Sequence, residues 1–282
     1  MQGKCHSCLC RTCLHTCCSR KSCKGKTETC RDYSGFRQLG MSGQGKKQKM
    51  QVLVACEESQ RVCMEFRRLG HEAYSCDIEP CSGGHPEWHI QADVLPLLGG
   101  GCIFRTADGM CHMVYGKWDI IIAHPPCTYL SNAGAARLYP QKGVLNQERY
   151  KKGMEAKEFF MEFYNADCPR IAIENPVPTR VYGLPEYSQI IQPYEHGHPY
   201  SKKTCLWLKG LPDLEPTRVV TGNIISWVSG GSRKTDGTKR GQAGTKFRDA
   251  KTRSKTFPGI AKAMAEQWGK VAFATMEGGE AK

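Results

Sequence analysis

The chain of 282 residues is long enough to bury a full hydrophobic core, and it fits one large domain with an appendage. Its hydrophobic fraction of 40% and charged fraction of 24% are ordinary for a folded protein, which argues against wholesale disorder. No stretch approaches the roughly 20 apolar residues of a membrane-spanning helix, and no apolar run marks a signal peptide, so we expect a cytoplasmic protein with no membrane partner.

The net charge of +13 is concentrated in two segments. Residues 1–50 carry eleven Lys and Arg against two acidic residues, and residues 218–255 carry ten against two, while the rest of the chain is mildly acidic. Two basic segments on an acidic body favour a protein that binds a polyanion through both segments. A pair of solvated, flexible segments is the alternative interpretation.

Eight of the 17 cysteines lie in the first thirty residues, a segment with almost no apolar side chains. The spacings Cys5-x2-Cys8 and Cys10-x2-Cys13 suit pairs of thiolates on one tetrahedral metal ion. Because the segment cannot fold on a hydrophobic core, metal binding would have to supply its folding free energy. We therefore predict a module over residues 1–33 that binds one or two Zn²⁺ ions, with the candidate ligands Cys5, Cys8, Cys10, Cys13, Cys17, Cys18, Cys23 and Cys30.

A disulfide framework is the alternative for this cluster, but it needs an oxidising compartment, and the missing signal peptide argues against one. Residues 34–50, rich in Gly, Gln and Lys, are predicted to be a basic linker.

From residue 51 the sequence alternates between apolar strands and amphipathic helices. The runs 51–55, 72–76, 118–123 and 170–174 are typical of buried strands, and helices are predicted over 61–69 and 149–164. A hairpin around an Asp-Gly turn is expected between residues 102 and 115. This repeated β-α-β pattern over residues 51–176 predicts a doubly wound, mostly parallel α/β sheet with right-handed crossovers.

Polar residues follow each predicted strand, and in open α/β sheets the ligand lies beyond the carboxyl ends of the strands. Residues 56–59 and 77–79 follow the first two strands, and Asp93 ends a short third segment. Residues 124–127 and 174–176 follow the next two strands. An acidic residue after the second strand suits the hydroxyls of a ribose, and Asp93 suits an adenine amino group.

The turn Pro125-Pro126-Cys127 after one strand and Glu174-Asn175 after the next resemble the catalytic elements of the DNA cytosine-5 methyltransferases. Residues 124–134, 174–177 and 253–268 resemble the short phage-encoded members of that family, and the resemblance covers about residues 52–268. It implies a Rossmann-like fold that binds S-adenosylmethionine and acts on double-stranded DNA. We expect a monomer, located in the cytoplasm of a bacterial host if a phage encodes it.

The resemblance also implies roles for individual residues. Cys127 is the nucleophile that adds to C6 of a cytosine flipped out of the duplex, and Glu174 holds N3 and the 4-amino group of that base. Pro126 and Asn175 complete the catalytic set. The candidate cofactor-binding residues are Ala55, Glu57, Ser59, Asp77, Ile78, Glu79, Asp93 and Pro125.

Residues 177–252 occupy the place of the family's target-recognition region and end in a run of Lys and Arg, which predicts steep salt dependence of DNA binding. The candidate DNA-binding residues are Arg233, Lys234, Lys239, Arg240, Lys246 and Arg248. A helix over 253–272 is expected to return to the catalytic domain, before a tail over 273–282.

The chain departs from the family at several points. Residues 56–59 replace the glycine-rich turn after the first strand, and no strand matches the family's arginine-bearing strand, although Arg180, Lys202 and Lys203 are basic residues nearby. Two other functions therefore stay open. An exocyclic-amine DNA methyltransferase on the same fold expects an aromatic residue where Cys127 stands, and a catalytically inactive zinc-containing DNA-binding protein accounts for the adjacent carboxylates in residues 57–58.

Overall fold

The computed structural model describes residues 49–141, 143–227 and 250–274. Contacts along the chain divide it into two units, residues 1–49 and 50–282, and nearly all described residues belong to the second. The eight candidate zinc ligands between Cys5 and Cys30 and the six candidate DNA-binding residues between Arg233 and Arg248 lie outside the described residues.

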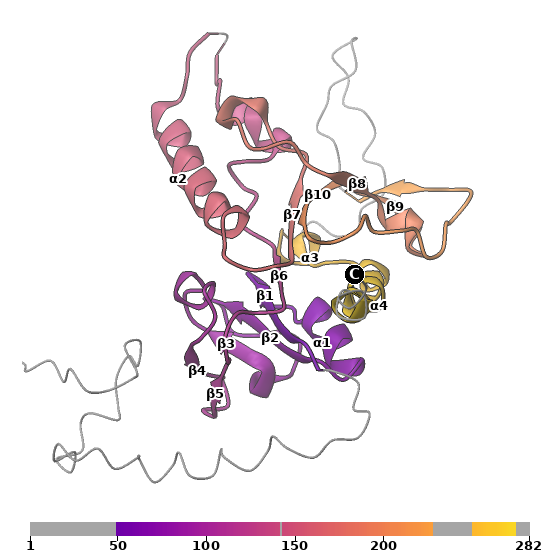
Figure 1. Cartoon of the computed structure of the whole chain (residues 1–282). Helices are drawn as coiled ribbons and strands as arrows, with labels where there is room; N and C mark the ends of the chain where they lie inside the picture. Colours follow the sequence, from indigo (N-terminus) through magenta and orange to yellow (C-terminus); the bar gives the residue numbers. More distant parts are fainter. Residues whose placement is uncertain (1–48, 142, 228–249, 275–282) are drawn as a thin grey trace, which may run out of the picture. The chain divides into compact units, whose positions relative to one another are not determined.

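Seven strands form one sheet in the order β3-β2-β1-β6-β7-β10-β8 (Figure 1). The first five are parallel, and β10 is antiparallel to both of its neighbours. The mostly parallel, doubly wound sheet expected from the sequence is thus confirmed. The strands are β1 (Gln51–Ala55), β2 (Glu72–Asp77), β3 (His89–Gln91), β6 (Ile120–Ala123), β7 (Ile171–Pro176), β8 (Gln189–Ile191) and β10 (Thr204–Lys209).

Helices cover both faces of the sheet, which explains why its central strands are apolar at every position. Along β1, Val52 and Val54 pack in one core with helices α1 (Arg61–Arg68) and α4 (Pro258–Ala274). The alternate residue Leu53 packs in the other core with α2 (Gln147–Tyr164). Successive side chains of a strand point to opposite faces, so a strand buried on both sides has no polar alternation.

The predicted hairpin forms between β4 (Ile103–Arg105) and β5 (Cys111–Met113), which are antiparallel. A short parallel pair joins β9 (Tyr200–Ser201) to β11 (Ile225–Ser226), and α3 (Ala250–Ser254) precedes α4. Among the described residues, no helix is long and apolar enough to cross a membrane.

Two element boundaries differ from the sequence expectation for identifiable reasons. Helix α2 begins at Gln147 because the side chain of Asn146 caps it by accepting a hydrogen bond from the backbone N–H of Arg149. Strand β6 begins only at Ile120, because the side chain of Asp119 accepts the backbone N–H of Gln51 at 2.7 Å in place of a strand carbonyl.

The order of strands reverses between β1 and β6, which makes their carboxyl ends the topological switch point of the sheet.

Candidate active site

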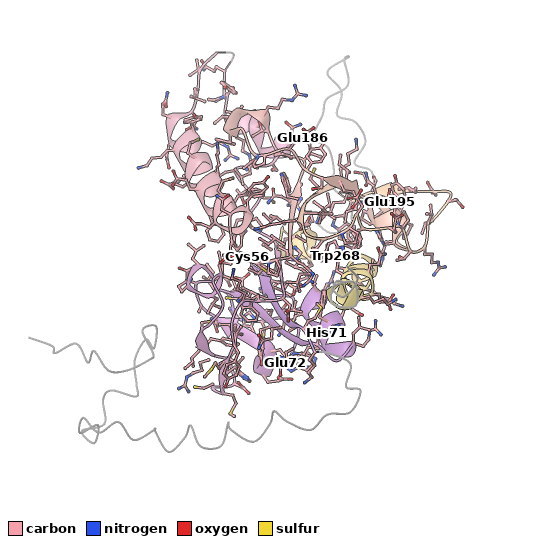
Figure 2. All side chains as sticks on the ribbon, viewed as in Figure 1. Cys56, His71, Glu72, Glu186, Glu195 and Trp268 are labelled. Atoms are coloured by element: carbon pink, nitrogen blue, oxygen red, sulfur yellow. The ribbon has the colours of Figure 1, made fainter. Side chains whose placement is uncertain are left out.

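The turn between β1 and α1 has an unusual backbone. Cys56, labelled in Figure 2, and Gln60 both have positive φ, at 57° and 58°, although neither is glycine. Between them, the carboxylate of Glu57 accepts hydrogen bonds from the backbone N–H groups of Val62 at 2.7 Å and Cys63 at 3.2 Å. Glu57, a predicted cofactor residue, is buried. Its side chain accepts from free backbone N–H groups at the N-terminus of α1, as the side chain of an N-cap residue usually does.

Two of the predicted cofactor carboxylates lie close to this turn. Burial, followed by the charge of Asp77, then the Cys76 thiol and the charge of Asp93, raises the pKa of the Cys56 thiol. The negative charges of Asp77 and Asp93, which lie near the ends of β2 and β3, therefore both act on the Cys56 thiol. Beside them Ile78 is 74% exposed, an unusual position for a large apolar side chain.

The other predicted cofactor residues have different surroundings. Glu79 is exposed, and its backbone N–H donates to the Asp77 carboxylate at 2.9 Å, which fixes the loop after β2. Ala55 and Ser59 are buried. The carbonyl of Ala55 accepts from the backbone N–H of His124 at 2.9 Å, which joins the ends of β1 and β6.

The turn that follows β6 is fastened to β7. The side-chain amide of Asn175 donates to the carbonyl of Pro125 at 2.9 Å, and Asn175 is 1% exposed. Pro126 is exposed and Cys127 is half-buried next to it. Asn175 of β7 is thereby joined to the turn after β6 that contains Pro126 and Cys127.

A buried ion pair connects the same two strands. His124 Nδ1 lies 3.1 Å from Glu174 Oε2, and the two side chains are only 10% and 12% exposed. Burial alone would lower the pKa of His124, but the hydrogen bond to Glu174, then the charges of Glu174 and Glu57, hold it above its ordinary value. Burial would likewise raise the pKa of Glu174, yet His124 and Lys202 hold it below its ordinary value. Each partner therefore favours the charged form of the other.

Cys127 shares this electrostatic environment. Burial raises the pKa of its thiol most, the negative charge of Glu174 raises it further, and the positive charge of Lys202 opposes them. The charge of Glu174 therefore acts on the Cys127 thiol. At neutral pH Cys127 rests as a thiol and must lose its proton before it can act as a nucleophile.

Sequence reasoning missed two members of this site. His124 was noted only as part of the loop after β6, and Lys202 only as a basic residue nearby. Strand β10 brings Lys202 to the site because it pairs antiparallel with β7, with Leu206 opposite Glu174 and Cys205 opposite Asn175. The run Thr204–Lys209 is mostly apolar and would have predicted this strand, although not its register.

The chain that follows residues 228–249 returns to the β1–α1 turn. Lys255 Nζ lies 3.7 Å from Glu58 Oε1 and donates to Ser82 Oγ at 2.8 Å. Arg61 donates to the carbonyl of Thr256 at 2.6 Å. The segment that leads into α4 is thereby attached to the candidate cofactor edge.

The described part of the chain contains no group of three or more His, Cys, Asp or Glu side chains arranged to hold a metal ion. The predicted zinc ligands lie outside that part, so their role stays a prediction.

Comparisons with known proteins give structural likenesses only. No family model matches the sequence, and no curated protein matches it with significance. One similar solved structure is a protein provisionally described as a DNA modification methyltransferase encoded within an E. coli prophage, at 14% identity and a TM-score of 0.33, over 61% of this chain and 52% of that one. Another is the Entamoeba histolytica methyltransferase EhMeth, at 12% identity and a TM-score of 0.33, over 62% of this chain and 58% of that one.

The chain spans little more than half the length of each of these two proteins. At such identities and scores, neither likeness assigns an activity. The functional argument therefore rests on the geometry of the site.

Proposed function

We propose that the protein is a DNA cytosine-5 methyltransferase that uses S-adenosylmethionine. The arrangement that carries the proposal lies at the ends of two adjacent strands: Glu174 of β7 contacts His124 after β6, and Asn175 of β7 fastens the turn that contains Cys127. A nucleophilic sulfur and a carboxyl group are the two groups that this chemistry needs on one base. The topological switch point between β1 and β6 is where an α/β sheet of this kind binds its ligand.

The chemistry assigns a task to each side chain. C5 of cytosine is a poor nucleophile until a thiolate adds to C6, which turns the ring into an enamine. Cys127 would supply that thiolate from a turn that Asn175 holds rigidly. Glu174 would bind N3 and the 4-amino group and offset the charge that develops on the ring. Because C6 is inaccessible in a duplex, the target base would have to be flipped out.

The residues at the open edge of the sheet fit the proposed cofactor. Asp77 and Asp93 both act on the β1–α1 turn, and carboxylates there can accept hydrogen bonds from ribose hydroxyls and an adenine amino group. Ile78, 74% exposed, offers an apolar surface for the adenine ring. When bound, S-adenosylmethionine supplies the electrophilic methyl group.

A covalent adduct tests the proposal directly. We would incubate the full chain and S-adenosylmethionine with long duplex DNA in which every cytosine is 5-fluorocytosine. A base must remove the C5 substituent before the sulfur can leave, and it cannot remove fluorine, so the adduct accumulates. After nuclease digestion, intact-mass analysis should find it in the wild type and in the matched control Cys111→Ser, whose thiol is exposed on β5. Cys127→Ser should abolish it.

The same experiment separates the two alternatives. An exocyclic-amine methyltransferase would methylate ordinary DNA but form no adduct through Cys127. An inactive DNA-binding protein would form no adduct and would not bind S-adenosylmethionine in calorimetry. An adduct that persists in Cys127→Ser would overturn the proposed nucleophile.

The remaining predicted parts complete the proposal. The basic residues between Arg233 and Arg248 would neutralise phosphates, and the segment with Cys5 to Cys30 would bind one or two Zn²⁺ ions and hold the duplex a second time. Elemental analysis of the purified full chain tests the zinc content. A protein without zinc in which the eight cysteines between Cys5 and Cys30 are oxidised in pairs would favour the disulfide alternative.

A further inference from the structure

Three neighbouring strands of the sheet each present one largely buried ionisable side chain near their carboxyl ends. In sheet order, β1 is followed by Glu57, β6 by His124, and β7 ends with Glu174 among its last residues. The imidazole therefore lies between two carboxylates, and both raise its pKa. Both acidic residues thus favour the protonated form of the imidazole, in a region with little solvent.

The two ring nitrogens of His124 have different environments. Nδ1 lies 3.1 Å from Glu174 Oε2, and because an ionised carboxylate can only accept, Nδ1 carries the hydrogen. Nε2 is buried and has no hydrogen-bond partner among the described residues. Among the described residues, the His124 ring therefore has one hydrogen-bond partner, Glu174, which is the carboxylate proposed to bind the base.

The charged groups around His124 come from four parts of the chain. They are Glu57 in the β1–α1 turn, Glu174 on β7, and Lys202 in the loop before β10, with the Cys127 thiol on the same turn as His124 itself. The two carboxylates favour the imidazolium and Lys202 opposes it. Glu57 is fixed by two backbone N–H groups of α1, so its position does not depend on a substrate.

We propose that His124 is a positioning residue that orients Glu174 and supplies, through it, the proton that N3 of the target cytosine takes up when Cys127 adds to C6. This inference rests on the proposed function and extends it to a residue for which the resemblance implies no role. His124 does not touch the base and acts only through the carboxylate.

The proposed step balances in protons and electrons. Cys127, whose proton has left to water, forms the Sγ–C6 bond with its electron pair. The C5–C6 π pair shifts to C4–C5, and the C4–N3 π pair moves onto N3. Glu174 takes the Nδ1 proton of His124 and passes this proton to N3. When the sulfur later leaves C6, the proton returns by the same path and the imidazolium forms again.

This arrangement predicts a distinctive pH dependence. The addition needs Cys127 without its proton and the His124–Glu174 pair with its proton. The ordinary pKa of a thiol, 9.0, is raised at Cys127, and the ordinary 6.5 of an imidazole is raised at His124. Below the pKa of His124 the rate should rise about tenfold per pH unit with the thiolate fraction. Above it, gain of thiolate and loss of imidazolium cancel, so the rate should level off.

The test measures the initial rate of adduct formation with the 5-fluorocytosine duplex, from about pH 5.5 to 9.5. The wild type should show the break just described. In His124→Asn the amide still donates to Glu174 but cannot titrate, so the break near neutral pH should disappear and the rate should fall at least about tenfold. Glu57→Gln removes the ionisable carboxyl group of the β1–α1 turn that raises the pKa of His124, and it should move the break to lower pH.

Histidine NMR gives a second measurement that needs no DNA. The imidazole signal that is missing from His124→Asn should titrate in the wild type above the ordinary pKa of 6.5, and it should shift to a lower pKa in Glu57→Gln. If His124→Asn fails to fold, side-chain assignment of the wild type identifies the His124 signal instead, and Glu57→Gln, which keeps an acceptor for the N-terminus of α1, still supplies the comparison.

The outcomes separate the two proposals. If the wild type forms no adduct at any pH, the proposed function and this inference both fail. If the adduct forms but the break is the same in His124→Asn, or does not move in Glu57→Gln, the proposed function stands and the role of His124 is overturned.

Discussion

The two halves of the carboxyl edge of the sheet differ in how they present their charges. At the ends of β2 and β3, Asp93 is exposed and Ile78 is 74% exposed, beside a partly exposed Asp77. At the ends of β6 and β7, His124 and Glu174 are only 10% and 12% exposed and contact each other. We refer to these as the open half and the closed half of the edge.

The difference matches two different tasks. Groups that bind and release a soluble ligand in every cycle benefit from exposure, because the ligand can reach them and water can replace it. Groups that act on charge developing in a reaction benefit from burial, because electrostatic interactions strengthen when water is excluded. The comparison therefore predicts that changes in the closed half affect the chemical step and changes in the open half affect cofactor affinity.

The largest effect is expected for Glu174→Gln in the closed half. The variant keeps the size of the side chain but loses the charge that offsets the reacting ring and receives the proton from His124. Loss of one such group typically slows the chemical step by about 10² to 10³. Single-turnover adduct formation measures the rate, and calorimetry should find the affinity for S-adenosylmethionine unchanged. A loss of affinity alone would place Glu174 in the open half instead.

A smaller effect, on cofactor affinity and not on the chemical step, is expected for Asp77→Asn in the open half. Loss of a charge-assisted hydrogen bond to a ribose hydroxyl should weaken S-adenosylmethionine binding by about tenfold, while the rate at saturating cofactor stays the same. The matched control is Asp167→Asn, an exposed carboxylate before β7, which should leave the affinity as it is. Equal effects of both substitutions would mean that Asp77 acts only through net charge.

The open half was the easier part to predict from the sequence. Its residues lie at or just after the ends of β2 and β3, and the short segment that ends in Asp77 marks both the strand and its carboxyl end. The same reasoning applies to the run of three isoleucines in β6, which predicted the strand and the turn after it. Signals of this kind are local, because burial on both faces determines the residue type at every position.

The closed half depends on contacts between residues far apart in the sequence, which no local sequence pattern predicts. His124 and Glu174 are 50 residues apart, and their pairing follows from the parallel contact of β6 with β7. Lys202 reaches the site through the antiparallel register of β10. The capping role of Glu57 requires positive φ at Cys56 and Gln60, which residues of these types rarely adopt. Only the three-dimensional structure defines these features.

The ion pair of the closed half should also make stability depend on pH. The pKa of Glu174 is lowered from 4.5, so its contribution is present above pH 4.5 and is lost as the pH falls through the folded-state value. The pKa of His124 is raised from 6.5, so its contribution is present below pH 6.5 and is lost as the pH rises through the folded-state value. The stabilising effect is therefore complete between these two values.

Thermal unfolding at several pH values measures this effect. Between about pH 4.5 and 6.5 we expect the wild type to melt about 2–4 °C above His124→Asn, a difference of roughly 1 kcal/mol in a chain of this size. The difference should shrink as the pH rises towards 9. A difference that stays constant as the pH rises would mean that the charged pair does not contribute to the stability of the closed half.

The smallest expected effect is on the reactivity of Cys127 in the protein without DNA. Glu174 raises the pKa of this thiol and Lys202 lowers it, so Glu174→Gln should increase the thiolate fraction and Lys202→Gln should decrease it. Alkylation by iodoacetamide at pH 7.5 to 8, about the range where thiolate is still the minor form, should be several-fold faster in the first variant and several-fold slower in the second.

Peptide mass mapping follows both sites at once, and the exposed Cys111 on β5 should react at the same rate in all three proteins. Opposite changes at Cys127 with no change at Cys111 mean that the two charges act on the sulfur through the closed site. If Cys127 accelerates in both variants, loosening of the turn explains the result better than charge does, because a more open turn would expose the thiol whichever side chain is removed. The sign of the Lys202→Gln effect therefore decides whether the closed half is an electrostatic unit or only a tightly packed one.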